Sequence, residues 1–187
     1  MASPVAHSFA GFWTFLLFAR QLQIRLAAHW REYLPQLGIL VLLANLPDFD
    51  LFISFALLGN GDLHHGFTHS LAVGVLVALA LSWVWRITTT FWRSALLYFI
   101  AYGSHLLIDL CTGSRLGWNN SGSGIPLLWP LTKKFSSPLI LVPGVLHLDL
   151  AALFSMENAR SSLYELLIFG AITAILLALR ARHLRKG

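Results

Sequence analysis

Long apolar runs alternate with short polar segments along the chain. The apolar runs cover residues 9–19, 34–46, 67–87, 91–111 and 163–180. The helix predicted over residues 8–30 opens with the first run and has a basic, interfacial C-terminal end that carries Arg20 and Arg25. A helix of about 20 apolar residues is long enough to cross a hydrocarbon core of about 30 Å. The pattern therefore predicts an all-α, polytopic membrane helix bundle with about five spanning helices.

Two apolar segments do not fit a plain crossing. Pro47 disfavours helical geometry at the residue before it, so the backbone is expected to break after the run 34–46 and to continue into a short run at 51–58. Residues 137–156 are apolar but contain two prolines, a glycine, a histidine and an aspartate. This mixture predicts a short re-entrant or interfacial segment.

The composition agrees with a membrane protein. Of the 187 residues, 57% are hydrophobic and only 11% are charged, with a mean hydropathy of +0.69. A soluble domain usually carries about 25% charged residues, so lipid must cover part of this surface. The length leaves no room for a second soluble module, and we expect a single integral-membrane domain over residues 1–187.

The basic residues follow the apolar runs and do not form one face. The net charge is +5, and several cations cluster at the C-terminus, where Arg180, Arg182, Arg185 and Lys186 follow the last run. This placement is typical of membrane anchoring, whereas nucleic-acid binding requires a contiguous basic patch. No nucleic-acid partner is expected. Cys111 is the only cysteine, which excludes an intrachain disulfide and a multi-thiolate zinc site.

Three groups of histidine and aspartate lie inside or beside the apolar runs. They are Asn45-Leu-Pro-Asp48-Phe-Asp50, His64-His65-Gly-Phe-Thr-His69-Ser70, and His105-Leu-Leu-Ile-Asp109. Ionisable side chains are costly in or near hydrocarbon, so each group is a functional hypothesis.

The spacing within these groups suits a divalent metal ion. His105 and Asp109 are four residues apart, so in a helix both side chains lie on one face and can reach a single ion. Asp48 and Asp50 would repel each other unless a cation lies between them. Neutral imidazole and carboxylate are good ligands for Zn and Mn.

The chain direction brings these groups to one face of the membrane. Asp48 ends one apolar run, residues 64–69 begin the next, and Asp109 ends the helix that returns. His7 precedes the first run and falls on the same face. Four chain segments are therefore predicted to contribute ligands to one site.

Structural roles are the alternatives for each group. His105 and Asp109 could form only a hydrogen-bonded pair, and Asp48 with Asp50 could cap the following short helix. Thr68 and Ser70 are also candidate helix caps. His147 and Asp149 stay open: they form a further ligand pair if the segment 137–156 folds back onto the site, and a polar anchor otherwise.

The motifs PDFD, HHGFTHS, HLLID followed by CTG, and PLLWP resemble the YdjM-type inner-membrane proteins. That family is described as LexA-regulated, membrane-bound metal-dependent hydrolases of bacteria, and the resemblance covers about residues 5 to 135. His65 stands where the family pattern has arginine. The resemblance implies a bacterial inner-membrane location, and it implies metal ligation by His7, Asp48, Asp50, His64, His69, His105 and Asp109. The order of motifs is also weakly similar to zinc-dependent phospholipase C, which implies phosphoester chemistry on lipids.

We therefore expect a membrane-embedded, metal-dependent hydrolase that acts on a lipid or lipid-linked phosphoester through metal-activated water. One or two divalent ions are expected, with Zn first and Mn or Mg as alternatives. Asp50 and His65 are the candidate catalytic residues, since a side chain left uncoordinated can serve as general base. The expected partners are the bilayer and an amphiphilic substrate. A divalent metal-ion transporter and a non-catalytic membrane scaffold are the alternative functions.

The orientation depends on residues 137–156. If they do not cross the membrane, the site side carries Arg115, Lys133, Lys134 and Arg160, and the other nine basic residues lie opposite. The positive-inside rule then places the site on the exoplasmic face. If the segment crosses, the count is seven against six and the rule gives no answer.

Overall fold

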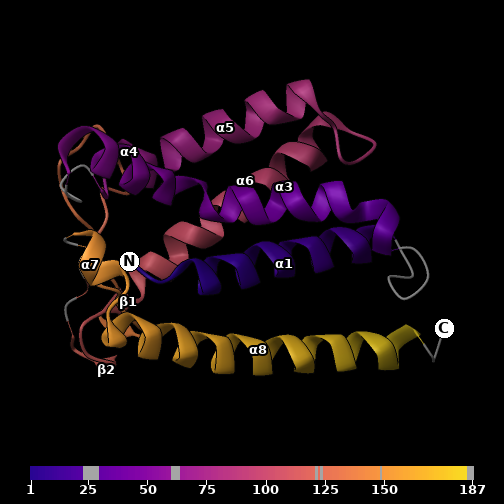
Figure 1. Cartoon of the computed structure of the whole chain (residues 1–187). Helices are drawn as coiled ribbons and strands as arrows, with labels where there is room; N and C mark the ends of the chain where they lie inside the picture. The colour runs from indigo at the N-terminus through magenta and orange to yellow at the C-terminus, as the bar shows by residue number, and fades with distance from the viewer. Residues whose placement is uncertain (23–29, 60–63, 121, 123, 148, 185–187) are drawn as a thin grey trace.

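The computed structural model describes residues 1–22, 30–59, 64–120, 122, 124–147 and 149–184. The described chain is mostly helical, and its long helices lie side by side (Figure 1). One end of the bundle holds the N-terminus, the short helices α4 (Phe49–Leu58) and α7 (Leu150–Leu153), and the loops that carry the strands. The last turns of α8 (Met156–Leu184) lie at the other end.

Helix α1 (Pro4–Gln21) begins at a local capping site and packs closely on α3 (Leu34–Asn45). The Ser3 hydroxyl accepts a hydrogen bond from the Val5 amide at 3.2 Å, and Pro4 occupies the first helical position, where its missing N–H costs nothing. Gly11 allows the close approach of the two helices, because a Cβ atom there would lie 2.6 Å from the Val41 Cα.

The predicted break at Pro47 is confirmed. A 3-10 turn, η2 (Leu46–Asp48), separates α3 from α4 (Phe49–Leu58). Asp48 stands at the start of α4 but its side chain makes no capping hydrogen bond. Capping is therefore not what places Asp48 here, and its carboxylate is free to face the interior of the bundle.

Helices α5 (Leu71–Val84) and α6 (Phe91–Leu110) form an antiparallel pair. The Ser70 hydroxyl caps α5 by accepting from the Val73 amide at 3.4 Å, which confirms the capping role expected for Ser70. A Cβ atom at Gly74 would lie 2.8 Å from the Tyr102 ring, so glycine allows the two helices to pack tightly. The main apolar core lies among α1, α3, α5 and α6 and includes Phe15, Phe18, Leu40, Leu43, Ala78, Leu97 and Tyr98.

The segment after α6 folds back over the end of the bundle. Strand β1 (Thr112–Gly113) pairs in parallel with β4 (Val142–Pro143), and β2 (Gly117–Trp118) pairs antiparallel with β3 (Leu139–Ile140). The described part of 137–156 holds β3, β4 and the short helix α7 (Leu150–Leu153), and no helix long enough to span a membrane. The described chain is mostly helical, as predicted, but it also contains two short strand pairs that the all-α prediction did not include.

Helix α8 (Met156–Leu184) lies against α1. The Trp13 ring stacks on Phe169 with centroids 5.3 Å apart, and its indole nitrogen donates to the Thr173 hydroxyl at 2.7 Å. Large apolar side chains on the rest of α8 are exposed, among them Leu163, Leu166, Leu167, Ile175 and Leu179. An exposed apolar helix of this kind suits contact with lipid.

Two helical segments among the described residues are long and apolar enough to cross a membrane, Trp30–Leu58 and Met156–Arg182. Helix α5 has only 14 residues, about 21 Å of helix, because η3 (Phe67–His69) and the Ser70 cap delay its start. The predicted number of about five spanning helices is not confirmed by these lengths.

Replacing Gly11 with alanine tests the α1–α3 packing. The added methyl group would meet Val41 backbone atoms, so we expect a loss of about 1–3 kcal/mol of stability, measured as a lower thermal unfolding midpoint in detergent. Gly38→Ala on α3 is the matched control, because a Cβ there meets nothing within 4 Å. Equal midpoints for both variants would contradict the close contact.

Candidate metal centre

Four side chains from three elements meet at the end of the bundle that holds the N-terminus. His7 comes from α1, Asp48 from η2, and His105 and Asp109 from α6. All four are buried, and one potential ligand atom from each lies within 4.8 Å of the others. We call these four residues the inner group. The His7 and His105 rings stack with centroids 3.7 Å apart.

Three more histidines form a second cluster beside the first. His64, His65 and His69 are buried and offer ligand atoms within 4.8 Å of one another, and we call them the outer group. They come from the loop before η3 and from η3 itself. Tyr102 of α6 donates its hydroxyl hydrogen to the Thr68 carbonyl oxygen, which holds η3 against α6.

Asp48 and Asp109 of the inner group also face the histidines of the outer group. Asp48 Oδ2 is 3.7 Å from His7 Nε2, and its Oδ1 is 3.4 Å from the Nε2 atoms of both His69 and His105. Asp109 Oδ1 is 3.6 Å from His7 Nε2, and its Oδ2 is 3.5 Å from His69 Nε2 and 3.3 Å from His105 Nε2. Each carboxylate therefore faces imidazoles of both groups.

The outer group approaches these carboxylates from the loop. The Nε2 atom of His64 is 3.8 Å from Asp48 Oδ1, and that of His65 is 3.7 Å from Asp109 Oδ2. His65 adopts a left-handed backbone conformation with φ 62°, which is uncommon for a residue other than glycine. Such strain is typical of functional sites, and here it accompanies the inward placement of the His65 ring.

In three of the histidines, the Nδ1 atom, which points away from Asp48 and Asp109, lies close to a hydrogen-bond acceptor. His105 Nδ1 lies 2.8 Å from the Ala44 carbonyl oxygen. His64 Nδ1 and His69 Nδ1 lie 2.6 and 3.2 Å from the two Asp50 oxygens. Since carbonyl and carboxylate oxygens only accept, each Nδ1 carries the hydrogen and each Nε2 presents a lone pair. Metal-binding histidines are oriented in the same way.

Asp50 thus has a different environment from the other two carboxylates. Its side chain lies behind the His64 and His69 rings and also accepts the Thr68 hydroxyl hydrogen at 2.6 Å. It belongs to neither the inner nor the outer group. Thr68, expected as a helix cap, instead hydrogen-bonds Asp50.

Several buried polar atoms of the inner and outer groups have no hydrogen-bond partner. They are both ring nitrogens of His7, both oxygens of Asp48, Nε2 of His64, Nε2 of His65 and Oδ2 of Asp109. A buried polar atom without a partner costs about 1–3 kcal/mol, and more when it is charged. A divalent cation would satisfy the oxygens and the lone pairs together, so these residues fit a metal ion.

Burial, the nearby positive N-terminus and the neighbouring His64 and His69 imidazoles together lower the pKa of His65 to about 2. The His65 imidazole is therefore neutral at neutral pH, which is the form that binds metal ions. Because the pKa of His65 is lower in the folded state than its ordinary value of about 6.5, the unfolded chain takes up a proton first as the pH falls. The free energy of unfolding therefore decreases below about pH 6.5.

His147 and Asp149, which the sequence left open as a ligand pair or a polar anchor, have different surroundings. The His147 ring lies beside the outer group, with its centroid 4.9 Å from that of His64. Asp149 instead caps α7, accepting from the Ala152 amide at 2.7 Å. The two residues do not act as a pair.

Sequence reasoning missed Glu165 on α8. Its carboxylate accepts from the Ser3 amide at 2.9 Å, from the Ser3 hydroxyl and from the Ala6 amide at 3.1 Å. These bonds fix the first turn of α1, which carries His7. The signal was present, because an acidic residue within the apolar run 163–180 is itself a functional hypothesis.

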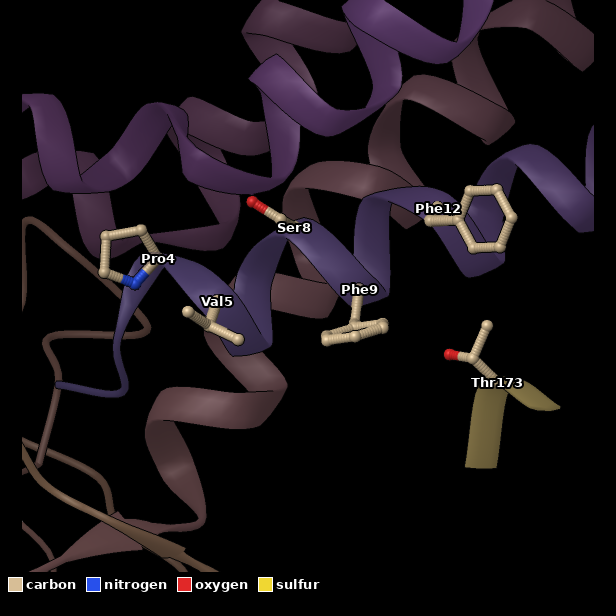
Figure 2. A pocket seen from close by; sticks show the side chains of 6 residues that line it. All are labelled: Pro4, Val5, Ser8, Phe9, Phe12 and Thr173. Carbon is tan, nitrogen blue, oxygen red and sulfur yellow. The ribbon is translucent and has the colours of Figure 1, made fainter. Parts of the chain in front are cut away.

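An apolar pocket of about 480 Å³ lies apart from the metal centre, between α1 and α8. Figure 2 shows its lining by α1 side chains, including Phe9 and Phe12, with Thr173 of α8 opposite them. The lining begins at Pro4, three residues before His7. The pocket contains none of the inner or outer group residues.

If the centre binds a divalent ion, Zn²⁺ or Mn²⁺ should stabilise the protein. At a free concentration of about 100 times Kd the gain is about 2.7 kcal/mol, measured as a higher thermal unfolding midpoint in detergent. We expect Asp109→Asn to abolish this shift, because it removes a charge shared by both groups. Asp149→Asn is the matched control and should keep the full shift. A shift that survives in Asp109→Asn would contradict ligation by Asp109.

The chain matches the YdjM inner membrane protein family over residues 1–184 and belongs to that family. No curated protein and no solved structure gives a significant match.

Proposed function

We propose that this member of the YdjM inner membrane protein family is a metal-dependent hydrolase of a lipid or lipid-linked phosphoester. The observation that carries the proposal is the convergence of five imidazoles on the two buried carboxylates Asp48 and Asp109. A purely structural network would satisfy its buried polar atoms internally, whereas this one leaves a set of them without partners.

The residues that would hold metal are the inner and outer groups, with Asp48 and Asp109 available to both. Two ions are favoured over one because the ligand atoms form two clusters. Zn is the first choice, since most of the donors are imidazole nitrogens. A divalent ion bound here would supply activated water and polarise the phosphoryl oxygen.

Asp50 and His65 would have roles beside those of Asp48 and Asp109. The Asp50 position behind His64 and His69 favours an orienting role, in place of direct ligation or general-base catalysis. His65 has two candidate roles, as a ligand of the outer group and as the proton acceptor expected from the sequence. Metal content in His65→Gln separates these roles, because only a ligand affects the amount of metal bound.

A lipid substrate is supported by the surroundings of the centre. Apolar side chains of α4 are exposed at the same end of the bundle, with Phe52 66% and Leu57 70% accessible. The apolar pocket between α1 and α8 begins close to His7 along the chain and has a lining that suits an acyl chain. A phosphoester head group at the metal centre with its acyl chain beside α1 fits both features.

Hydrolysis by the purified protein is the direct test. We expect phosphatidylglycerol vesicles carrying the protein to release a water-soluble phosphoester product, detected by mass spectrometry, and a chelator to abolish the release. Asp109→Asn should lose both metal and activity, and Asp149→Asn should keep both. Full activity with full metal content in Asp109→Asn would count against the proposal, and metal flux into sealed liposomes without hydrolysis would favour transport.

Asp50→Asn tests the orienting role. The amide keeps the shape of the side chain but holds the His64 and His69 rings less firmly, and loss of such a partner typically costs 10–100-fold in metal affinity. We expect a drop of this size in a competition titration with a zinc indicator. An effect as complete as that of Asp109→Asn would instead make Asp50 a ligand.

A further inference from the structure

His147 lies at the outer edge of the metal centre. It follows β4 in the loop that leads to α7. Its ring is nearly perpendicular to that of His64, at a centroid distance of 4.9 Å, and lies 6.0 Å from that of His65. The inner and outer group histidines are buried, whereas His147 is partly exposed. It is therefore placed where the centre meets its surroundings.

A buried asparagine on α8 fixes the residue before His147. Asn158 Oδ1 accepts from the Leu146 amide at 2.7 Å, and Asn158 Nδ2 donates to the Leu146 carbonyl oxygen at 2.7 Å. The same Nδ2 donates to the Ala152 carbonyl oxygen at 2.8 Å. One side chain thus holds the loop on both sides of His147, which is more than a solvated surface histidine requires.

The orientation of the His147 ring is also determined. Its Nδ1 lies 3.1 Å from the Val145 carbonyl oxygen, so Nδ1 is the nitrogen that donates and Nε2 is left as an acceptor. The Nε2 atoms of the inner and outer group histidines face the carboxylates Asp48 and Asp109. No contact of this kind links His147 to either carboxylate among the described residues.

We propose that His147 is a further substrate-contacting residue, whose Nε2 accepts a hydrogen bond from an O–H group at the edge of the metal centre. The donor is either water or a hydroxyl group of the substrate head group. Asn158 is the positioning residue that holds His147 in place. The proposal rests on the proposed hydrolase function.

The test uses the full-length protein in phosphatidylcholine vesicles and two phosphodiesters. Bis(p-nitrophenyl) phosphate has no hydroxyl group, and phosphatidylglycerol has two in its head group. For His147→Ala we expect unchanged metal content and a loss of about tenfold in kcat/KM, the size of one hydrogen bond. A loss with both substrates identifies water as the donor, and a loss with phosphatidylglycerol alone identifies the head group.

Two further variants separate a chemical role from a structural one. His147→Gln keeps an acceptor near the Nε2 position and should recover part of the activity. Added imidazole should restore activity to His147→Ala but not to Asn158→Ala, in which the His147 ring is still present and misplaced. Asp149→Asn, in the same loop, is the control and should behave as the wild type.

Each contrary result has a distinct meaning. Loss of metal from His147→Ala would make the residue a ligand and overturn the proposal. Wild-type kcat/KM for His147→Ala with both substrates would overturn it while leaving the hydrolase function intact. A wild-type protein that binds metal but hydrolyses neither substrate would count against the hydrolase function itself, and the proposal would fall with it.

Discussion

The attraction between two buried carboxylates and the imidazoles around them organises one end of this protein. Asp48 and Asp109 are only 5% and 1% exposed, and the desolvation of a carboxylate costs several kcal/mol unless opposite charge or hydrogen-bond donors compensate. The compensation comes from α1, from the loop at η3 and from α6 itself. The ends of these elements therefore lie close together, and the segment after α6 folds over the metal centre that they form.

Much of this centre follows from chain direction and helix geometry. The four-residue spacing of His105 and Asp109 places both on one face of α6, and the reversal of the chain between apolar runs carries Asp48 and the outer group to the same end. The break at Pro47 follows from local sterics. These predictions use only local geometry and the order of segments, which is why a single sequence suffices for them.

Other features depend on contacts between distant residues. Glu165 hydrogen-bonds to Ser3, which lies far from it along the chain. Asn158 hydrogen-bonds to Leu146, in a loop without regular structure. No local sequence pattern shows which partner either side chain will contact. The strand ladders are only two residues long, too short to give an alternating pattern. Apolar runs also overestimate helix length, since the Ser70 cap starts α5 later than hydropathy suggests.

Helix α8 connects the membrane-facing surface with the metal centre, although it supplies no member of the inner or outer group. Glu165 holds the first turn of α1. The Ala2 amide beside that turn donates to Asp109 Oδ1 at 3.0 Å, and Asp109 Oδ2 faces His65, His69 and His105. Asn158, two turns earlier on the same helix, holds the loop of His147. Because one helix holds both the first turn of α1 and the loop of His147, a displacement of α8 would act on His7 and His147 together.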